Sequence, residues 1–440
     1  MSDVYKDGHR PFVASGDIPP SPPPSSAVGP VAWLRQNLFS GVANSLMTLV
    51  GIYLIYSLLA SVIPWLFLDS VWNAGSLGEC RQIDDGACLA VIRERYLQFI
   101  FGFYPEAEQW RAILLFILLP VAAAPILFTA LPRQMLFFSG LYPMLGYWLV
   151  WGGFIWGPVG VLLTPIFAVI VYRVLKQVVE SALDDSLGFI AGVGGAILVA
   201  VLWLLFGVEL FDDAVGGVIP IGLPVVESDL LGGFLLSLIL GVTGIAASLP
   251  IGIALALGRR SNLIFIRAIC TGFIEFIRGV PLITLLFVAS TLLNYFLPPG
   301  TTFDIILRVV IMVTLFASAY MAEVIRGGLA ALPRGQYEAA DALGLDYWKS
   351  MRLIILPQAL KISIPGIVNT FIGLFKDTTL VSVIALLDPV GILNPIRADQ
   401  DWNGIVWELY GFVGLFFFIF CFSMSRYSIY LERKLQTGHR

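Results

Sequence analysis

Charged side chains are scarce in this sequence, and histidine is almost absent. Only 13% of the 440 residues are Asp, Glu, Lys or Arg, and the formal net charge is -4. So few charges provide no basic surface on which a nucleic acid would bind. The two histidines, His9 and His439, lie at the chain ends, and no group of Cys, His and carboxylate residues has metal-ligand spacing. We therefore expect neither a nucleic-acid partner nor a metal site.

Motifs for catalysis are missing as well. None of the six lysines lies in a G-x-x-x-x-G-K-[ST] loop, so the chain has no phosphate-binding loop with which to hydrolyse ATP. There is also no G-x-S-x-G nucleophile elbow and no H-E-x-x-H metalloprotease helix. We expect a chain that is not an enzyme and that binds no cofactor itself.

Long apolar runs are what the sequence has in abundance. Hydrophobic residues make up 58% of the chain, and the mean hydropathy is +0.87. A helix needs about 20 apolar residues to cross a bilayer. Runs of this kind lie at 42–68, 111–131, 137–155, 159–174, 187–207, 231–257, 280–297, 304–326, 362–386 and 406–425. They predict an all-α polytopic membrane protein with about ten transmembrane helices. Gly157 and Pro158 interrupt the region 137–174. The alternative is that this region forms a re-entrant hairpin that does not cross the membrane, which would leave eight spans.

The distribution of basic residues predicts the orientation. Arg259 and Arg260 lie in one loop, and Lys349 and Arg352 lie in a later loop of the same set, whereas residues 208–230 carry five acidic residues and no Lys or Arg. Basic loops stay on the cytoplasmic side. We expect a bacterial inner-membrane protein with both termini in the cytoplasm.

The N-terminal half is expected to contain three kinds of segment. Residues 1–40 are rich in Pro and Ser, which predicts a disordered cytoplasmic tail. Residues 41–229 should hold additional transmembrane helices, with a periplasmic loop at 69–110. Cys80 and Cys88 lie in that loop, on the oxidising side of the membrane. We expect a disulfide between them, and two free thiols are the alternative.

Small residues recur every fourth position in the run 231–257. They are Gly244, Ser248, Gly252 and Ala256. Such a face lets another helix approach closely. We expect it to pack against a helix of the same chain, with a subunit interface as the alternative.

A few charged and polar residues fall in or near membrane segments, where they are costly and usually face a partner or a cavity. The candidates for lining a path through the membrane are Lys376, Asp377, Thr378 and Thr379 in the run 362–386, together with Glu275 and Arg278. Pro365 and Gly373 in the same run favour a bent or broken helix, whose freed backbone groups would line a polar path. Structural pairing of these charges is the other interpretation, and both stay open.

The longest cytoplasmic loop, 327–360, is too good a helix former to be a passive linker. It is typical of two short helices separated by Gly344, which is able to take a positive φ and end the first helix. Asp346 is then the N-cap candidate for the second helix. The general alternative is a surface helix lying on the bilayer.

The spacing of this loop argues for something more specific. Glu-Ala-Ala, three residues, Gly, nine residues and Ile-x-Leu-Pro are supplied by Glu338, Ala339, Ala340, Gly344, Ile354, Leu356 and Pro357. The pattern resembles the EAA loop of ABC importer permeases. In that family the loop supplies a coupling helix that docks into a groove of the ATPase subunit. The resemblance therefore implies that these seven residues couple the chain to a separate ATPase.

The resemblance extends over 230–440. The stretches "FIEFIRGVPLITLLF" (273–287), "SAYMAEVIRGGLAALPRGQYEAA" (318–340) and "LFKDTTLVSVIALLD" (374–388) are similar to ABC permeases of the polar amino-acid (histidine/glutamine-type) uptake family. "YPEAEQWR" (104–111) and "SRYSIYLERKL" (425–435), with the two loop cysteines, are similar to the general L-amino-acid ABC transporter permeases. This implies a C-terminal permease domain with a five-helix core at 230–440.

The family also implies a function and a set of partners. The chain would be the permease subunit of an ATP-driven importer that moves L-amino acids from the periplasm to the cytoplasm. A periplasmic amino-acid-binding protein would deliver the substrate, a paralogous permease subunit would complete a heterodimer, and an ABC ATPase dimer would use ATP and Mg. The alternatives are an ion-coupled secondary amino-acid transporter and a gated channel.

Overall fold

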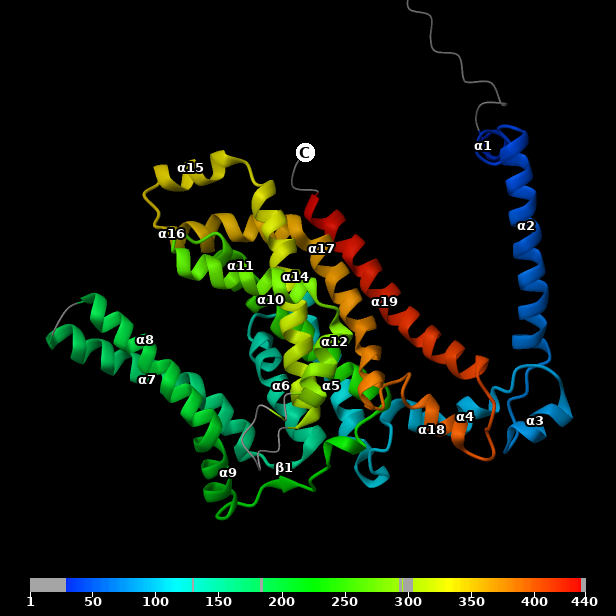
Figure 1. Cartoon of the computed structure of the whole chain (residues 1–440), viewed down its shortest axis with the longest axis horizontal. Coiled ribbons are helices and arrows are strands. Elements are labelled where there is room, and N and C mark those ends of the chain that lie inside the picture. Colours follow the sequence, from blue (N-terminus) through cyan, green and yellow to red (C-terminus); the bar gives the residue numbers. More distant parts are fainter. Residues whose placement is uncertain (1–28, 129, 183–184, 293–294, 296–303, 437–440) are drawn as a thin grey trace, which may run out of the picture. The chain divides into compact units, whose positions relative to one another are not determined.

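The computed structural model describes residues 29–128, 130–182, 185–292, 295 and 304–436 (Figure 1). The chain forms two compact units. The first contains Met1–Trp72 and Cys80–Cys88, and the second contains Asn73–Glu79 and Leu89–Arg440.

The first unit holds one long apolar helix. Helix α1 (Pro30–Asn37) precedes α2 (Val42–Ile63), which continues through a π-helical turn to Leu68. The predicted disordered tail lies outside the described residues up to 28, but the prediction is wrong for Pro30–Asn37. Pro30 occupies the first helical position, where its fixed φ favours a helix and its missing N–H is not needed.

A disulfide closes the loop after α2. Cys80, from α3 (Leu77–Ile83), is bonded to Cys88 with their Cα atoms 5.8 Å apart, and both residues are buried. The N–H of Ala87 donates to the carbonyl of Trp65 at 2.7 Å. The disulfide-bonded loop is thus also hydrogen-bonded to the π-helical turn that ends the long helix.

The second unit begins with three helices: α4 (Ala90–Phe101), α5 (Gln109–Leu127) and α6 (Met135–Trp151). Helices α5 and α6 pack against each other. The Tyr142 hydroxyl donates to the Leu115 carbonyl at 2.9 Å, and the Ser139 hydroxyl donates to the Ala122 carbonyl at 2.7 Å. These bonds satisfy polar side chains that would otherwise be costly between apolar helices.

A helical hairpin follows (Figure 1). It is formed by α7 (Trp156–Ala182) and α8 (Asp185–Leu202), and α9 (Val208–Gly216) continues from a π-helical turn. Two short strands, β1 (Gly153–Phe154) and β2 (Gly222–Leu223), pair antiparallel before and after it. The run predicted at 159–174 is therefore part of a longer helix. Helix α7 continues past the apolar residues into a polar end that contains Lys176 and Glu180.

The permease core contains five longer helical segments. They are α10 (Gly233–Arg259), α11 (Ile264–Gly279) with α12 (Leu282–Phe287), α14 (Ile305–Ala331), α17 (Leu356–Asp377) and α19 (Trp407–Gln436). Shorter helices connect them: α15 (Arg334–Ala342), α16 (Tyr347–Ser350) and α18 (Leu393–Ala398). Helix α14 packs against α10 and α17, and α17 packs against α19.

The small residues of α10 make its contacts within the chain. All four are buried. A Cβ added at Gly252 would lie 2.7 Å from Met321 of α14, and one added at Gly244 would lie 3.1 Å from Leu374 of α17. The prediction of close packing inside this chain is confirmed.

Among the described residues, eight helices are long and apolar enough to span a membrane. The pair formed by α11 and the segment Leu282–Leu292 is a ninth candidate, bent by 101°. Pro281 explains the bend, since a residue before proline avoids helical geometry and Val280 is extended (φ -110, ψ 133). Helix α6 is apolar but has only 17 residues. The all-α polytopic prediction with a five-helix core is confirmed, and each of the ten predicted runs contains a helix.

Backbone segments far apart in sequence meet at one end of the second unit. Gly102 bridges to Leu231, and Gly232 bridges to Leu387. Gly233 has a φ of +58, and a Cβ there would lie 2.2 Å from the Phe99 carbonyl. Only glycine permits this approach. The segment after α4 is therefore joined to the start of α10 and to the loop after α17.

Candidate functional site

Helix α15 ends in the way that its glycine predicts. Gly344 has a φ of +69. Its N–H donates to the Asp341 carbonyl at 2.9 Å, and the N–H of Leu345 donates to the Ala340 carbonyl at 3.2 Å. This pair of bonds is the Schellman arrangement, in which a left-handed residue closes the last turn. The prediction that Gly344 ends the first short helix is confirmed.

The second helix starts at the predicted cap. The Asp346 carboxylate accepts a hydrogen bond from the Lys349 N–H at 2.9 Å and lies 3.0 Å from the Lys349 ammonium. The Lys349 N–H, followed by its side chain, lowers the pKa of this carboxyl. The helix does not stop after a few turns, however. It continues through a π-helical segment (Met351–Ile355) into α17. The prediction that the second short helix of the loop ends before a separate membrane helix begins at residue 362 is therefore wrong.

Several contacts hold α15 against the permease core. Ala340 is fully buried. The Gln358 amide of α17 donates to Gln336 at 2.9 Å, and the Arg260 guanidinium, just beyond α10, donates to the Tyr337 hydroxyl at 3.1 Å. A small residue at 340 is needed because α15 lies directly on the following helix. The coupling segment, by which we mean residues 334–357, is thus fastened at both ends.

The seven motif residues divide between an inner and an outer surface. Ala340 is buried, and Ile354 and Leu356 are half-buried, whereas Glu338, Ala339, Gly344 and Pro357 are exposed. The motif missed three large exposed neighbours, Leu343, Tyr347 and Trp348, whose exposed fractions are 73%, 50% and 70%. Their position next to Gly344, outside any apolar run, could have identified them from the sequence as exposed apolar residues. An exposed apolar group of this kind on either side of a capped turn is typical of a protein docking surface.

The structural interpretation assumed that Glu275 and Arg278 pair with each other. They do not, because each pairs with a residue of another helix. Glu275 lies 2.8 Å from Arg259 of α10, and Arg278 lies 3.5 Å from Glu323 of α14. Glu323 also pairs with Arg326 at 2.5 Å and with Arg259 at 3.4 Å. Three arginines and two glutamates therefore join α10, α11 and α14. Sequence reasoning missed Arg259, whose partners are distant in the chain.

The Lys376–Thr379 segment lies where α17 changes into a 3-10 helix (Thr378–Ile384). Helix α17 runs without a break past Pro365 and Gly373, so of the predicted bent or broken helix the broken form is wrong. Thr378 is buried, and its hydroxyl lies 2.8 Å from the Phe375 carbonyl and 3.1 Å from the Ser237 hydroxyl. The Thr379 hydroxyl donates to the Lys376 carbonyl at 2.8 Å. Both threonines are thus engaged with the protein.

Lys376 and Asp377 are placed differently. Lys376 is exposed and Asp377 is half-buried, and within the described part of the chain neither forms an ion pair. The structure brings Glu275 and Arg278 into the network at the end of α10. No hydrogen bond or ion pair between described residues joins that network to Lys376 or Asp377.

Comparison with known proteins identifies the family. Residues 248–437 match the family described as the binding-protein-dependent transport system inner membrane component. The chain is 56% identical over 438 residues to the glutamate/glutamine/aspartate/asparagine transport system permease protein BztC of Rhodobacter capsulatus, with 98% of this chain and 99% of the relative covered. The chain belongs to this family of transport permeases. It is a multi-pass membrane component of an ABC importer.

Other relatives agree. The inner membrane amino-acid ABC transporter permease protein YhdY of Escherichia coli is 39% identical over 423 residues, which cover 96% of this chain and 97% of the relative. The probable glutamine ABC transporter permease protein GlnM of Bacillus subtilis is 33% identical over 209 residues, covering 47% of this chain and 93% of the relative. A solved amino acid ABC transporter is 30% identical, with a TM-score of 0.41 over 45% of this chain and 90% of that chain. Neither YhdY nor GlnM favours an ion-coupled secondary transporter.

Proposed function

We propose that this permease passes L-amino acids from the periplasm to the cytoplasm, and that a separate ABC ATPase drives the transport through the coupling segment. The observation that carries the coupling role is the capped turn at Gly344, which exposes Glu338, Ala339 and Leu343 while Ala340 and Tyr337 fasten the segment to the core. A force applied to this surface would reach α14 and α17 directly, because α15 lies between them in the chain.

The substrate class rests on the relatives. BztC is named for glutamate, glutamine, aspartate and asparagine, and YhdY for amino acids. At 56% identity over nearly the whole of both chains, BztC supports the same four amino acids as first candidates for this permease. A periplasmic amino-acid-binding protein would deliver them.

The proposed assembly contains this chain, a paralogous permease subunit and an ATPase dimer that binds ATP and Mg. Both termini would face the cytoplasm, since the loops rich in Lys and Arg include the coupling segment. The lack of a phosphate-binding loop in this sequence supports a division of labour in which only the partner hydrolyses ATP.

Reconstitution of the complete transporter tests this function. Proteoliposomes that contain ATP should accumulate labelled glutamate when the binding protein is added outside, and an ionophore that dissipates ion gradients should not stop the uptake. Vesicles without ATP should accumulate none. Uptake that follows an ion gradient in the absence of ATP would contradict the proposal.

The four candidate substrates are compared in the same vesicles. Unlabelled glutamine, aspartate and asparagine should each compete with labelled glutamate, whereas a basic amino acid should not. If ATP drives the uptake of a different amino acid and of none of these four, the substrate assignment is contradicted, but the coupling role is not.

A further inference from the structure

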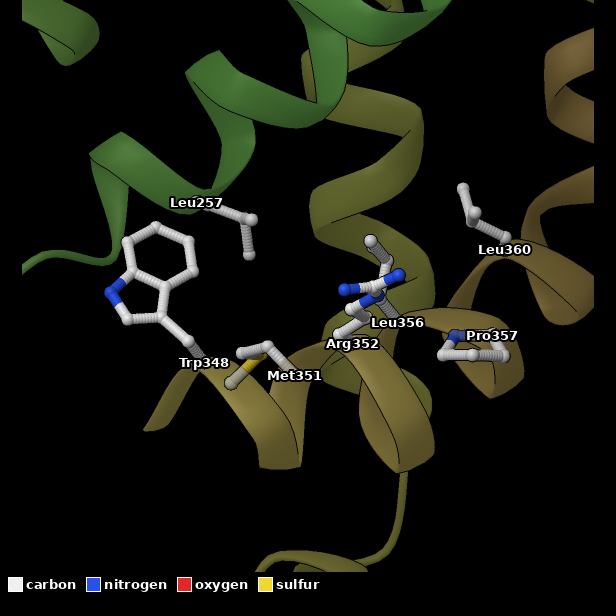
Figure 2. A pocket seen from close by; sticks show the side chains of 7 residues that line it. All are labelled: Leu257, Trp348, Met351, Arg352, Leu356, Pro357 and Leu360. Atoms are coloured by element: carbon white, nitrogen blue, oxygen red, sulfur yellow. The ribbon is translucent and has the colours of Figure 1, made fainter. Parts of the chain in front are cut away.

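An apolar groove lies beside the coupling segment, between the end of α10 and the helix that leads into α17 (Figure 2). Its volume is about 360 Å³. Leu257 forms one wall, and Trp348, Leu356 and Leu360 lie among the side chains of the other. A volume of this size is large enough to hold part of a small-molecule ligand.

One cation interrupts the apolar lining. Figure 2 shows the Arg352 guanidinium between Leu257 and Leu360, and among the residues that the structure describes it is the only charged group lining the groove. Arg352 is exposed, and no ion pair joins it to another described residue. The neighbouring Lys349, by contrast, is neutralised by Asp346 at 3.0 Å. The groove therefore offers one unmatched positive charge beside an apolar wall.

The groove lies at the ends of two candidate membrane spans. Leu257 is near the end of the span Gly233–Arg259, and the other wall belongs to the first turns of the span Tyr347–Ile384. The basic residues of these ends predict that they face the cytoplasmic leaflet, where anionic lipids gather against positive charge. Basic pockets between membrane helices on this side are suited to anionic headgroups.

A protein segment fits the groove less well than a lipid does. A peptide would bury backbone N–H and C=O groups there, and among the described residues the lining offers only the Arg352 guanidinium and the Trp348 indole N–H as polar side-chain groups. Buried backbone groups without partners are costly, whereas an acyl chain has none to satisfy. The single cation likewise matches one phosphate.

We propose that this groove binds one anionic phospholipid, with its acyl chain against Trp348 and Leu360 and its phosphate paired with Arg352. Trp348 belongs to the exposed surface of the coupling segment as well as to the groove. A bound lipid would hold this side chain in place, and so make ATPase coupling sensitive to the lipid composition.

Native mass spectrometry of the full-length permease tests the site. The protein is released from detergent in the presence of phosphatidylglycerol or phosphatidylethanolamine with identical acyl chains. The parental chain should retain one phosphatidylglycerol in clear preference to phosphatidylethanolamine. Arg352→Gln should lower that retention about tenfold and remove the preference, because the phosphate loses its charged partner. Equal retention by the parental chain and Arg352→Gln would overturn the proposal.

Two further variants separate this site from general attraction to positive charge. Lys361→Gln removes an exposed cation of α17 that does not line the groove, and it should leave the preference unchanged. Leu360→Trp fills the groove without changing its charge, and it should lose the lipid while the melting temperature stays near the parental value. Loss of binding in Lys361→Gln equal to that in Arg352→Gln would overturn the assignment to this groove.

The occupant is identified in native membranes. A photo-reactive benzoylphenylalanine in place of Trp348 should form an adduct with the mass of a phospholipid. An adduct with the ATPase or with a second permease subunit, and none with lipid, would show a protein docking site and overturn the proposal. Both results are independent of transport, so they differ from a failure of the proposed amino-acid uptake.

Discussion

Gly344 is a residue at which the backbone conformation alone makes a substitution informative. Its φ of +69 is unfavourable for a residue with a side chain by about 1–2 kcal/mol. Apart from Gly344 itself and its two chain neighbours, no described residue has an atom within 4 Å of the position that a Cβ would take, so the side chain would point into open space on the exposed surface. A substitution here will therefore be felt chiefly by whatever docks on the coupling segment.

We predict that Gly344→Asp abolishes uptake by weakening ATPase association. The added carboxylate joins Asp341 and Asp346 around the turn, and it would lose its water when the ATPase covers it. The measurement is the recovery of ATPase with tagged permease, together with ligand-stimulated ATP hydrolysis in vesicles. Asparagine has the same shape and tolerates a positive φ equally well. Gly344→Asn should therefore keep most of the association, and equal losses in the two variants would assign the effect to shape instead of charge.

Glu338→Ala should give a milder form of the same defect, about tenfold in ATPase recovery. Its carboxylate is exposed beside Ala339, whereas the buried contact of Ala340 would remain. Truncation removes one charge-assisted bond at the docking surface but leaves the packing. Normal recovery in Glu338→Ala would restrict the docking surface to Leu343, Tyr347 and Trp348.

Asp388 predicts a dependence of stability on pH. Burial raises the pKa of this carboxyl to about 6, although it accepts hydrogen bonds from the N–H groups of Val390 and Gly391. Aspartate in an unfolded chain titrates near pH 3.9, so the folded protein binds more protons between about pH 4 and 6, and stability falls as pH rises through this window. The difference of about two pKa units corresponds to at most about 3 kcal/mol.

The melting temperature in detergent should accordingly be higher at pH 5 than at pH 7.5. Asp388→Asn should remove this part of the dependence, whereas Asp401→Asn, at an exposed position, should keep it. A parental pH profile in Asp388→Asn would show that other groups cause it.

Residue-scale features were predictable where their cause is local. The turn at Gly344 and the cap at Asp346 follow from three or four neighbouring residues, and the structure has both. The burial of Asp388 and the ion pairs of Arg259 were not predictable, since their partners come from elements distant in the sequence.

Among the elements, α10, α11 and α14 depend on one carboxylate. Glu323 is approached by Arg326, Arg259 and Arg278. In Glu323→Gln these three cations would repel one another, so we predict a loss of stability of about 1–2 kcal/mol, reduced by the 26% exposure of the side chain. Glu275→Gln, in which a more exposed side chain loses only Arg259, should cost less than about 1 kcal/mol. Thermal unfolding in detergent measures both, and the reverse order would contradict the central place of Glu323.

We propose that the junction of α17 with its 3-10 continuation contributes to the substrate path. Lys376→Ala or Asp377→Ala should lower uptake at least tenfold while ATPase recovery stays normal, because unpaired charges in a span are kept for contact with substrate or water. Lys361→Ala, on the same helix outside the junction, is the control. Thr378→Val should instead lower stability, since its hydroxyl lies against Phe375 and Ser237. Parental uptake in both charge variants would remove them from the path.

Helix existence was easier to predict than helix ends. Apolar runs located a helix in every case, but α7 and α17 extend well beyond them, because a helix continues into polar residues once its hydrogen-bond ladder is established. The apolar runs did not include helix α11 in a span, since Arg267, Glu275 and Arg278 interrupt its apolar face, and only the family resemblance of 273–287 covered its end. The bend at Pro281 then joins it to the run that was predicted.

At the scale of the whole molecule, the pairing of β1 with β2 favours one of two topologies. With eight spans the region 137–174 would not cross, and β1 would stay on the cytoplasmic side while residues 208–230 lie outside. The two strands pair directly, with Gly153 opposite Leu223 and Phe154 opposite Gly222. Paired strands lie on one side of a membrane, so this register favours ten crossings, with α6 among them.

Labelling of single cysteines tests this topology in intact cells. In a chain with Cys270 and Cys421 replaced by serine, and with the Cys80–Cys88 disulfide kept, Val225→Cys should react with a membrane-impermeant maleimide, because Val225 is 75% exposed in the predicted periplasmic loop. Gly335→Cys, in α15, should react only after the membrane is permeabilised. Ile155→Cys decides the count: its N–H donates to the Ile221 carbonyl at 3.0 Å, so it should be labelled from outside, as Val225→Cys is. Labelling of Ile155→Cys only after permeabilisation would favour eight spans and contradict the strand pairing.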